Sequence, residues 1–146
     1  MGGAPPRDDD GRVRPHDDPA IPDEAFVVRY IASGQFVPDR AAGAGRRLSK
    51  GAFSASSKDR DPYQGMSADL LQPMIADGLP PTGQRKPIHE AVVRLQVGKL
   101  RSLGLWVGKD PKEHNPYHVC VWGVTPHLRK KILDLAEWVE KPPDVA

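Results

Sequence analysis

The stretch 125-TPHLRKKILDLAEWVE-140 decides the fold class of this 146-residue chain. Thr125 is a typical N-cap residue, and Pro126 suits the first helical position, where a missing N–H leaves no hydrogen bond unmade. Apolar residues then recur at helical spacing along one face: Leu128, Ile132, Leu135 and Val139. The pattern predicts one amphipathic helix over residues 126–139. Because such a stripe must be buried, we expect the helix to pack on a β-sheet.

Upstream segments supply the strands of that sheet. Alternating or β-branched residues predict strands at 25–31, 89–97, 105–107 and 117–122, and a further short one at 52–56. The polar, proline-containing link between 105–107 and 117–122 indicates that these two pair antiparallel.

Two shorter helices complete the pattern. One begins at a predicted N-cap, Ser67, and carries Pro73 inside it, where proline should kink it or restart it. The other covers residues 98–103 and ends before Gly104. We therefore predict an α+β fold with a small mixed or antiparallel sheet of four or five strands, two or three helices, and the C-terminal amphipathic helix packed on the sheet.

Charge and composition divide the chain near residue 22. Residues 1–22 are rich in proline, glycine and aspartate and have few apolar side chains, so we expect a disordered acidic tail. Residues 23–146 are expected to form a single α+β domain. Residues 1–24 hold three basic and seven acidic residues, a net charge of −4, which leaves +6 on the rest of a chain whose net charge is +2.

Several classes of protein are excluded by composition. A single cysteine, Cys120, allows no intramolecular disulfide, which favours a reducing, cytoplasmic location. No run approaches the roughly 18 apolar residues of a membrane span. The abundance of arginine, alanine, glycine and proline fits a GC-rich bacterial source. We predict no cofactor, and the oligomeric state stays open.

Basic residues give the leading functional hypothesis. A basic body attracts polyanions or an acidic partner, although dispersed charge can also serve only to keep a protein in solution. Two prolines stiffen the loop 110–117, and a rigid polar loop makes a good recognition surface. We expect a non-catalytic interaction module that binds a macromolecular partner, protein or nucleic acid. The candidate anion-binding residues are Arg94, Lys99, Arg101, Lys109, Arg129, Lys130 and Lys131.

A metal site is a further alternative. His114, His118 and Cys120 are residue types that bind zinc, and a strand places His118 and Cys120 on one face. A structural zinc site needs four ligands, so a buried free cysteine beside a half-buried histidine is the competing interpretation.

One more order of residues suggests an enzyme. Arg29 lies on the first predicted strand, Ser54 and Ser56 lie in a serine-rich segment, and Glu90 begins a later strand. This order resembles that of ADP-ribosyltransferases, although alanine stands where that family has threonine and its Glu-x-Glu motif is absent. The resemblance implies a small NAD-consuming enzyme. Arg29 would then hold an NAD phosphate, Ser54 or Ser56 would brace the site, and Glu90 would bind the ribose.

Overall fold

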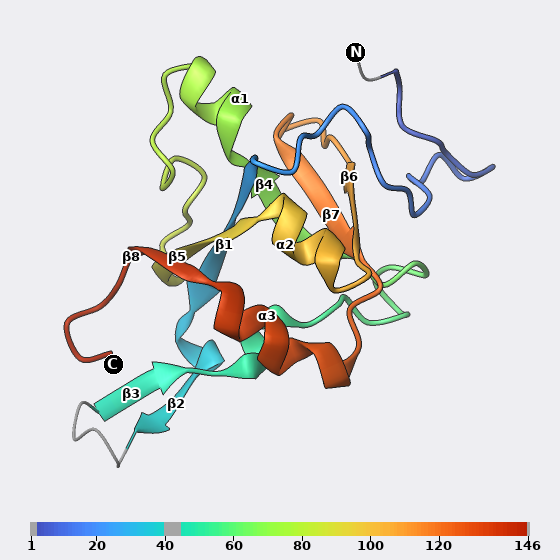
Figure 1. Ribbon diagram of the computed structural model, residues 1–146. Helices are drawn as coiled ribbons and strands as arrows, with labels where there is room; N and C mark the ends of the chain where they lie inside the picture. The colour runs from blue at the N-terminus through green and yellow to red at the C-terminus, as the bar shows by residue number, and fades with distance from the viewer. Residues whose placement is uncertain (1–2, 40–44, 146) are drawn as a thin grey trace.

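A six-stranded antiparallel sheet forms the centre of the computed structural model, which describes residues 3–39 and 45–145 (Figure 1). Its strand order is β6-β7-β4-β1-β5-β8. These strands are β6 (Trp106–Lys109), β7 (His118–Trp122), β4 (Met66–Leu70), β1 (Phe26–Ala32), β5 (His89–Gln96) and β8 (Glu137–Glu140). A separate two-stranded hairpin pairs β2 (Phe36–Asp39) with β3 (Gly45–Leu48).

In the described part of the chain, three short α-helices connect the strands. They are α1 (Leu71–Ala76), α2 (Val97–Ser102) and α3 (Arg129–Leu135). The same part of the chain also includes three 3₁₀ turns: η1 (Ser33–Gln35), η2 (Lys50–Phe53) and η3 (Pro126–Leu128). Within the described residues, no helix has the length and apolar character needed to cross a membrane.

The main core lies on one face of the sheet. Side chains at alternate strand positions meet there because successive residues of a strand point to opposite faces. Val27 and Ile31 of β1 and Val93 of β5 belong to this core, together with Leu100 of α2 and Ile132 of α3. All five are fully buried or nearly so. A smaller core around Val28, Met74 and Val92 lies on the other face.

The predicted class, α+β with an antiparallel sheet and three helices, is confirmed. The predicted number of four or five strands is wrong, because six strands form the sheet and two more form the hairpin. The pairing of the segments that contain Trp106 and Trp122 is antiparallel, as predicted, with these two tryptophans opposite each other.

The predicted helix over residues 126–139 is divided. Helical structure ends at Leu135, Ala136 is extended, and residues 137–140 form β8. The reason is the open edge of β5, whose backbone groups pair with this segment in the register Val93↔Trp138. Glu-Trp-Val-Glu also alternates in polarity as a strand does.

The predicted helix from Ser67 is also displaced. Residues 66–70 form β4, which pairs with β7, and the helix begins only at Leu71. Pro73 therefore lies in the first helical turn, where its missing N–H removes no intrahelical bond, and the helix continues to Ala76. The short strand expected at residues 52–56 is absent, since residues 50–53 form η2.

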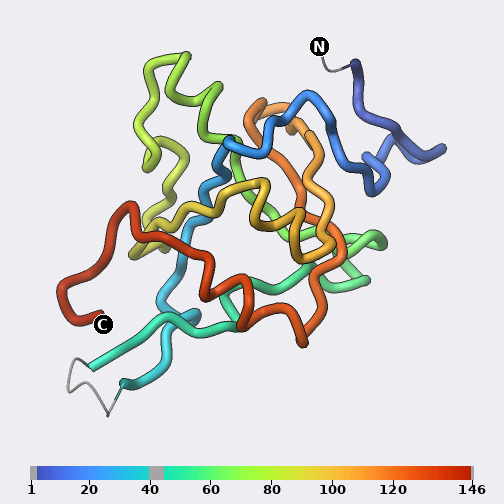
Figure 2. Tube along the Cα trace, in the orientation of Figure 1, coloured from blue at the N-terminus to red at the C-terminus, as the bar shows by residue number. Residues whose placement is uncertain are grey.

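The N-terminal segment lies along the β6–β7 side of the sheet (Figure 2). The Asp18 backbone N–H donates to the carbonyl oxygen of Val107 at 2.9 Å, and Ile21 is 1% exposed in the main core. The division of the chain into a disordered tail and a domain from residue 23 stays a prediction, but residues 3–22 have defined contacts here. Both predicted regions include residues that lie outside the described ones, namely 1–2 in the first region and 40–44 and 146 in the second.

Candidate functional site

The face of the sheet opposite the main core is covered at both ends and hollow in the middle. Over β6, the ring of His16 contacts Trp122 at a centroid distance of 5.2 Å, and Gly108 has no room for a Cβ beneath His16. Over β1 and β5, Met74 of α1 packs with Val28. Between the two covers, the strip of the sheet belongs to β7, β4 and β1.

Two adjoining hollows occupy this strip and together form what we call the central cleft. The first has a volume of about 420 Å³ and the second about 430 Å³. Both are lined by Ser67, Lys112 and His118, so the cleft is continuous across the sheet face. The proline-containing loop 110–117 contributes to the wall of each.

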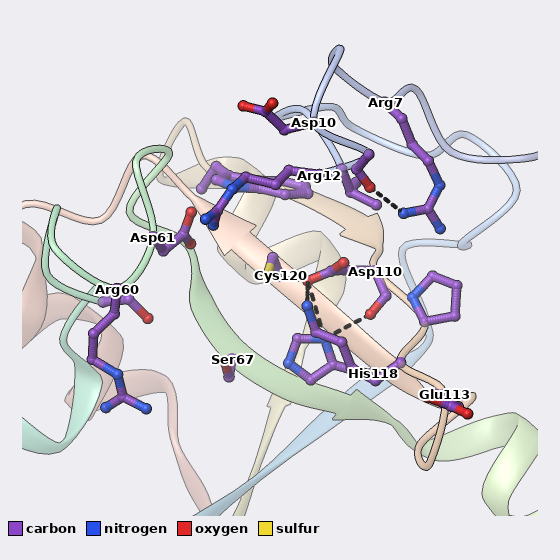
Figure 3. A pocket seen from close by; sticks show the side chains of 16 residues that line it. Arg7, Asp10, Arg12, Arg60, Asp61, Ser67, Asp110, Glu113, His118 and Cys120 are labelled. Carbon is purple, nitrogen blue, oxygen red and sulfur yellow. Dashed lines mark hydrogen bonds and ion pairs between the residues drawn. The ribbon is translucent and has the colours of Figure 1, made fainter.

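Asp110, His118 and Cys120 form a compact cluster in the first hollow (Figure 3). The Cys120 thiol donates to Asp110 Oδ2 at 3.3 Å. His118 Nδ1 lies 2.8 Å from the carbonyl oxygen of Asp110, an atom that can only accept, so this nitrogen carries the hydrogen. Burial and the neighbouring Asp110 carboxylate raise the pKa of the Cys120 thiol, which is therefore protonated at neutral pH.

Asp69 is the centre of the second hollow. It is 4% exposed, and the Asn115 side chain donates to its Oδ1 at 2.8 Å. The same Asn115 accepts from Gln84 Nε2 at 3.2 Å and from the Tyr117 backbone N–H at 3.2 Å, which fixes the loop 110–117 against the sheet. Burial, and after it the charge of Asp69, raise the pKa of Tyr30, so its hydroxyl stays neutral.

The rim of the cleft carries more positive than negative side chains. Arg7, Arg12 and Arg60 line the first hollow and Lys86 the second, against the rim acids Asp10 and Glu113. Figure 3 places Arg7 and Arg60 on opposite sides of the cluster. Within residues 3–39 and 45–145, these four cations form no ion pair.

The basic residues singled out in the sequence do not gather at this cleft. Arg101 is held by Asp17 and Asp23, Arg94 pairs with Glu137, and Lys130 pairs with Asp134. The others are spread over three elements: Lys99 on α2, Lys109 on β6, and Arg129 and Lys131 on α3. Three of the rim cations were missed, because Arg7 and Arg12 belong to the predicted tail and Arg60 to a turn-rich segment.

The four residues of the ADP-ribosyltransferase-like order lie in different surroundings. Arg29 donates to the carbonyl oxygens of Ala52 and Ser67, at 2.8 and 2.5 Å. The hydroxyl of Ser54 donates to the carbonyl oxygen of Gly51 at 2.7 Å.

Glu90 accepts from Arg46, with a shortest distance of 3.0 Å. Ser56 lines the first hollow and Arg29 the second, and neither Ser54 nor Glu90 lines either of them. The structure therefore does not bring the four into one pocket.

Of the candidate metal ligands, His118 and Cys120 do come together, while His114 lines the second hollow. Asp110 completes the set in place of His114. The predicted antiparallel pairing could have identified it, because Asp110 directly follows β6 and its N–H donates to the carbonyl oxygen of His118 at 3.0 Å.

Comparisons of the chain with protein-family models, with curated proteins and with solved structures found no match.

Proposed function

We propose that the protein is a non-catalytic interaction module that binds an extended acidic segment of a partner protein in the central cleft. One observation carries the proposal: the inner carboxylates of the cleft have partners within the chain, whereas the four rim cations form no ion pair with any described residue. Asp61 accepts from the backbone N–H groups of Tyr63 and Gly65, each at 2.9 Å. Asp69 is bound by Asn115, and Asp110 by Lys112 among others. Unpaired cations around such a cleft favour an anionic ligand.

The stiffness of the loop 110–117 supports the same function. Lys112 and Asn115 exchange backbone hydrogen bonds of 3.0 and 3.1 Å, and Tyr117 donates from its hydroxyl to Asp77 at 2.6 Å. A wall that is already ordered costs less entropy when a partner binds.

A protein segment fits the cleft better than a nucleic acid does. Single-stranded nucleic acids are held by stacking on exposed aromatic rings. Trp122 in the first hollow is 4% exposed, and the hydroxyl of Tyr30 in the second is turned toward Pro81. Trp106 is exposed but does not line the cleft.

The opposite face of the sheet is less accessible to a partner than the cleft face. We infer that α3 packs over that face, with Ile132 as its anchor in the main core. A reduced Cys120 suits action in the cytoplasm.

The experiment measures binding of a fluorescent ten-residue glutamate peptide by anisotropy at low salt. We expect the double variant Arg12→Glu, Arg60→Glu to weaken binding at least about tenfold, because it reverses two unpaired rim charges. The control is Lys99→Glu, Lys131→Glu, which changes the net charge equally at two exposed positions outside the cleft.

Equal losses in the two double variants would mean that net charge alone attracts the peptide, and the cleft would not be the site. Tighter binding of an oligothymidylate with the same number of charges, weakened by the same rim variants, would overturn the choice of a protein partner.

A further inference from the structure

We propose that Asp110, His118 and Cys120 form a binding site for Zn²⁺ in the first hollow of the central cleft. The proposal is independent of the acidic partner segment. A carboxylate oxygen, an imidazole nitrogen and a thiolate sulfur are the three ligand types that zinc takes in proteins. One ligand atom from each residue lies within 4.8 Å of the other two.

The backbone holds these three side chains in place before any metal arrives. His118 and Cys120 are two residues apart on β7 and therefore point to the same face of the sheet. Asp110 follows β6 directly and is tied to β7 by its backbone bond to His118. Side chains on two paired strands lose little conformational entropy when they bind a metal, which favours tight binding.

The distances suit a small tetrahedral ion. Zinc bonds of about 2.3 Å to sulfur and about 2.0 Å to oxygen place those two ligand atoms about 3.5 Å apart. In the structure, Cys120 Sγ and Asp110 Oδ2 are 3.3 Å apart. A thiol hydrogen bond accounts for the same separation without a metal, so the experiment must distinguish the two.

His118 faces the cluster through its Nδ1, which lies 3.3 Å from Asp110 Oδ2 and 2.8 Å from the carbonyl oxygen of Asp110. A metal ion at the cluster would therefore bind this nitrogen in place of its hydrogen, and the ring would carry the hydrogen on Nε2.

A second observation indicates that an acceptor is missing from this hollow. Trp122 lines it, and its buried indole Nε1 has no hydrogen-bond partner among residues 3–39 and 45–145. Three protein ligands leave the fourth zinc position to a water molecule, which is an acceptor. A water in the first hollow would give the indole N–H a partner.

Lys112 is the side chain that opposes a metal. Its Nζ lies 3.1 Å from Asp110 Oδ2 and places a positive charge at the cluster. The Lys112 side chain is half exposed and can turn into solvent when the ion enters. Binding then replaces the thiol hydrogen of Cys120 by zinc and releases that proton to water, while the Asp110 carboxylate keeps its charge.

The experiment uses the full chain, freed of metal with a chelator and then titrated with Co²⁺ and Zn²⁺. We expect one equivalent of Co²⁺ to give a thiolate-to-cobalt charge-transfer band, Zn²⁺ to displace it, and Zn²⁺ to raise the Tm. Cys120→Ser should lose the band, and His118→Gln should weaken binding more than about tenfold.

Two variants serve as matched controls for position and charge. His114→Gln should leave the affinity unchanged, because that ring lines the other hollow. Lys112→Ala should strengthen binding, because the competing charge is removed. Absence of a band and of a Tm shift in the unmodified chain would overturn the proposal. An equal loss in His114→Gln and His118→Gln would also overturn it.

Discussion

Arg29 of β1 binds η2 and the part of β4 that lies beyond the β1–β4 ladder. The pairing of β1 with β4 covers only Val27↔Leu70 and Val28↔Asp69. Beyond it, the Arg29 guanidinium donates to the Ser67 carbonyl oxygen on β4 and to the Ala52 carbonyl oxygen on η2. Burial lowers its pKa to about 10, so it remains charged at neutral pH. The Arg29 side chain therefore supplies a donor to the carbonyl oxygens of Ser67 and Ala52, which the β1–β4 ladder does not reach.

Replacing Arg29 by methionine keeps the stem but leaves the two carbonyl groups without their donors. We expect Arg29→Met to lower the free energy of unfolding by about 1–3 kcal/mol, measured by urea denaturation. Arg47→Met, on the exposed side of β3, should change it by less than about 0.5 kcal/mol. If the two variants were equally stable, the role assigned to the guanidinium would be wrong.

At the scale of elements, Arg101 of α2 fastens the N-terminal segment. Its guanidinium bonds to the carboxylates of Asp17 and Asp23, at 3.0 and 2.7 Å. It also donates to the carbonyl oxygens of Asp18 and Ile21, both at 2.8 Å. One side chain on a short helix thus organises the turn that leads into β1.

Arg101→Ala should release this segment, because four acceptors lose their donor at once. We expect faster hydrogen exchange at residues 13–22 and faster tryptic cleavage after Arg12, with a loss of about 1–3 kcal/mol in stability. Lys99→Ala, exposed on the same helix, is the control and should leave both rates unchanged. Unchanged exchange in Arg101→Ala would show that Ile21 and Val13 suffice to hold the segment.

The elements also show which patterns in the sequence were informative. Segments such as 89–97, with strict alternation on a buried strand, were predicted almost to the residue. Residues 66–70 and 137–140 were not, because they are short and their strand state depends on a partner far away in the chain. Leu128, Ile132 and Leu135 share a buried or partly buried helical face, as the apolar spacing predicted. The helix is shorter than predicted, because it ends at Leu135.

The site was predictable only in part, for a related reason. His118 and Cys120 share a face by local geometry, which the alternation of β7 indicates from sequence alone. Asp110 could have been placed opposite His118 from the predicted hairpin. Asp69 could not, because its segment was assigned to a helix, and the rim arginines Arg7 and Arg12 could not, because nothing local ties the N-terminal segment to the cleft.

At the scale of the whole molecule, aspartates fasten the two ends of the described chain. Near the N-terminus, the Tyr63 hydroxyl donates to Asp8 at 2.6 Å, and this bond holds the pKa of Asp8 below its ordinary value of 3.8. Near the C-terminus, Arg46 donates to Asp144 at 2.7 and 2.8 Å, which lowers the pKa of Asp144 in the same way.

Because the pKa values of Asp8 and Asp144 are lowered in the folded chain, the free energy of unfolding decreases as the pH falls. The unfolded chain binds protons more readily at these groups, so their contribution to stability is complete above about pH 5 and is lost as the pH falls through the lowered values. We expect the combined variant Tyr63→Phe, Arg46→Gln to flatten the decline in unfolding free energy between about pH 5 and about pH 3. Arg47→Gln should keep the original slope, and an unflattened slope in the combined variant would contradict the assignment.

The bonds between residues 17–18 and Val107 have a consequence for behaviour in concentrated solution. Val107 lies on β6, the outermost strand on that side, and its N–H and carbonyl groups are occupied by Asp17 and Asp18 at 2.9 Å each. At the other margin, the four-residue β8 presents Glu137 and Glu140. Edge strands with unpaired backbone groups can pair with further copies of a chain and form fibrils. Short or charged edge strands resist such pairing. We therefore expect proteolytic loss of the N-terminal segment to expose the backbone groups of Val107 and to favour the addition of strands from neighbouring molecules at β6.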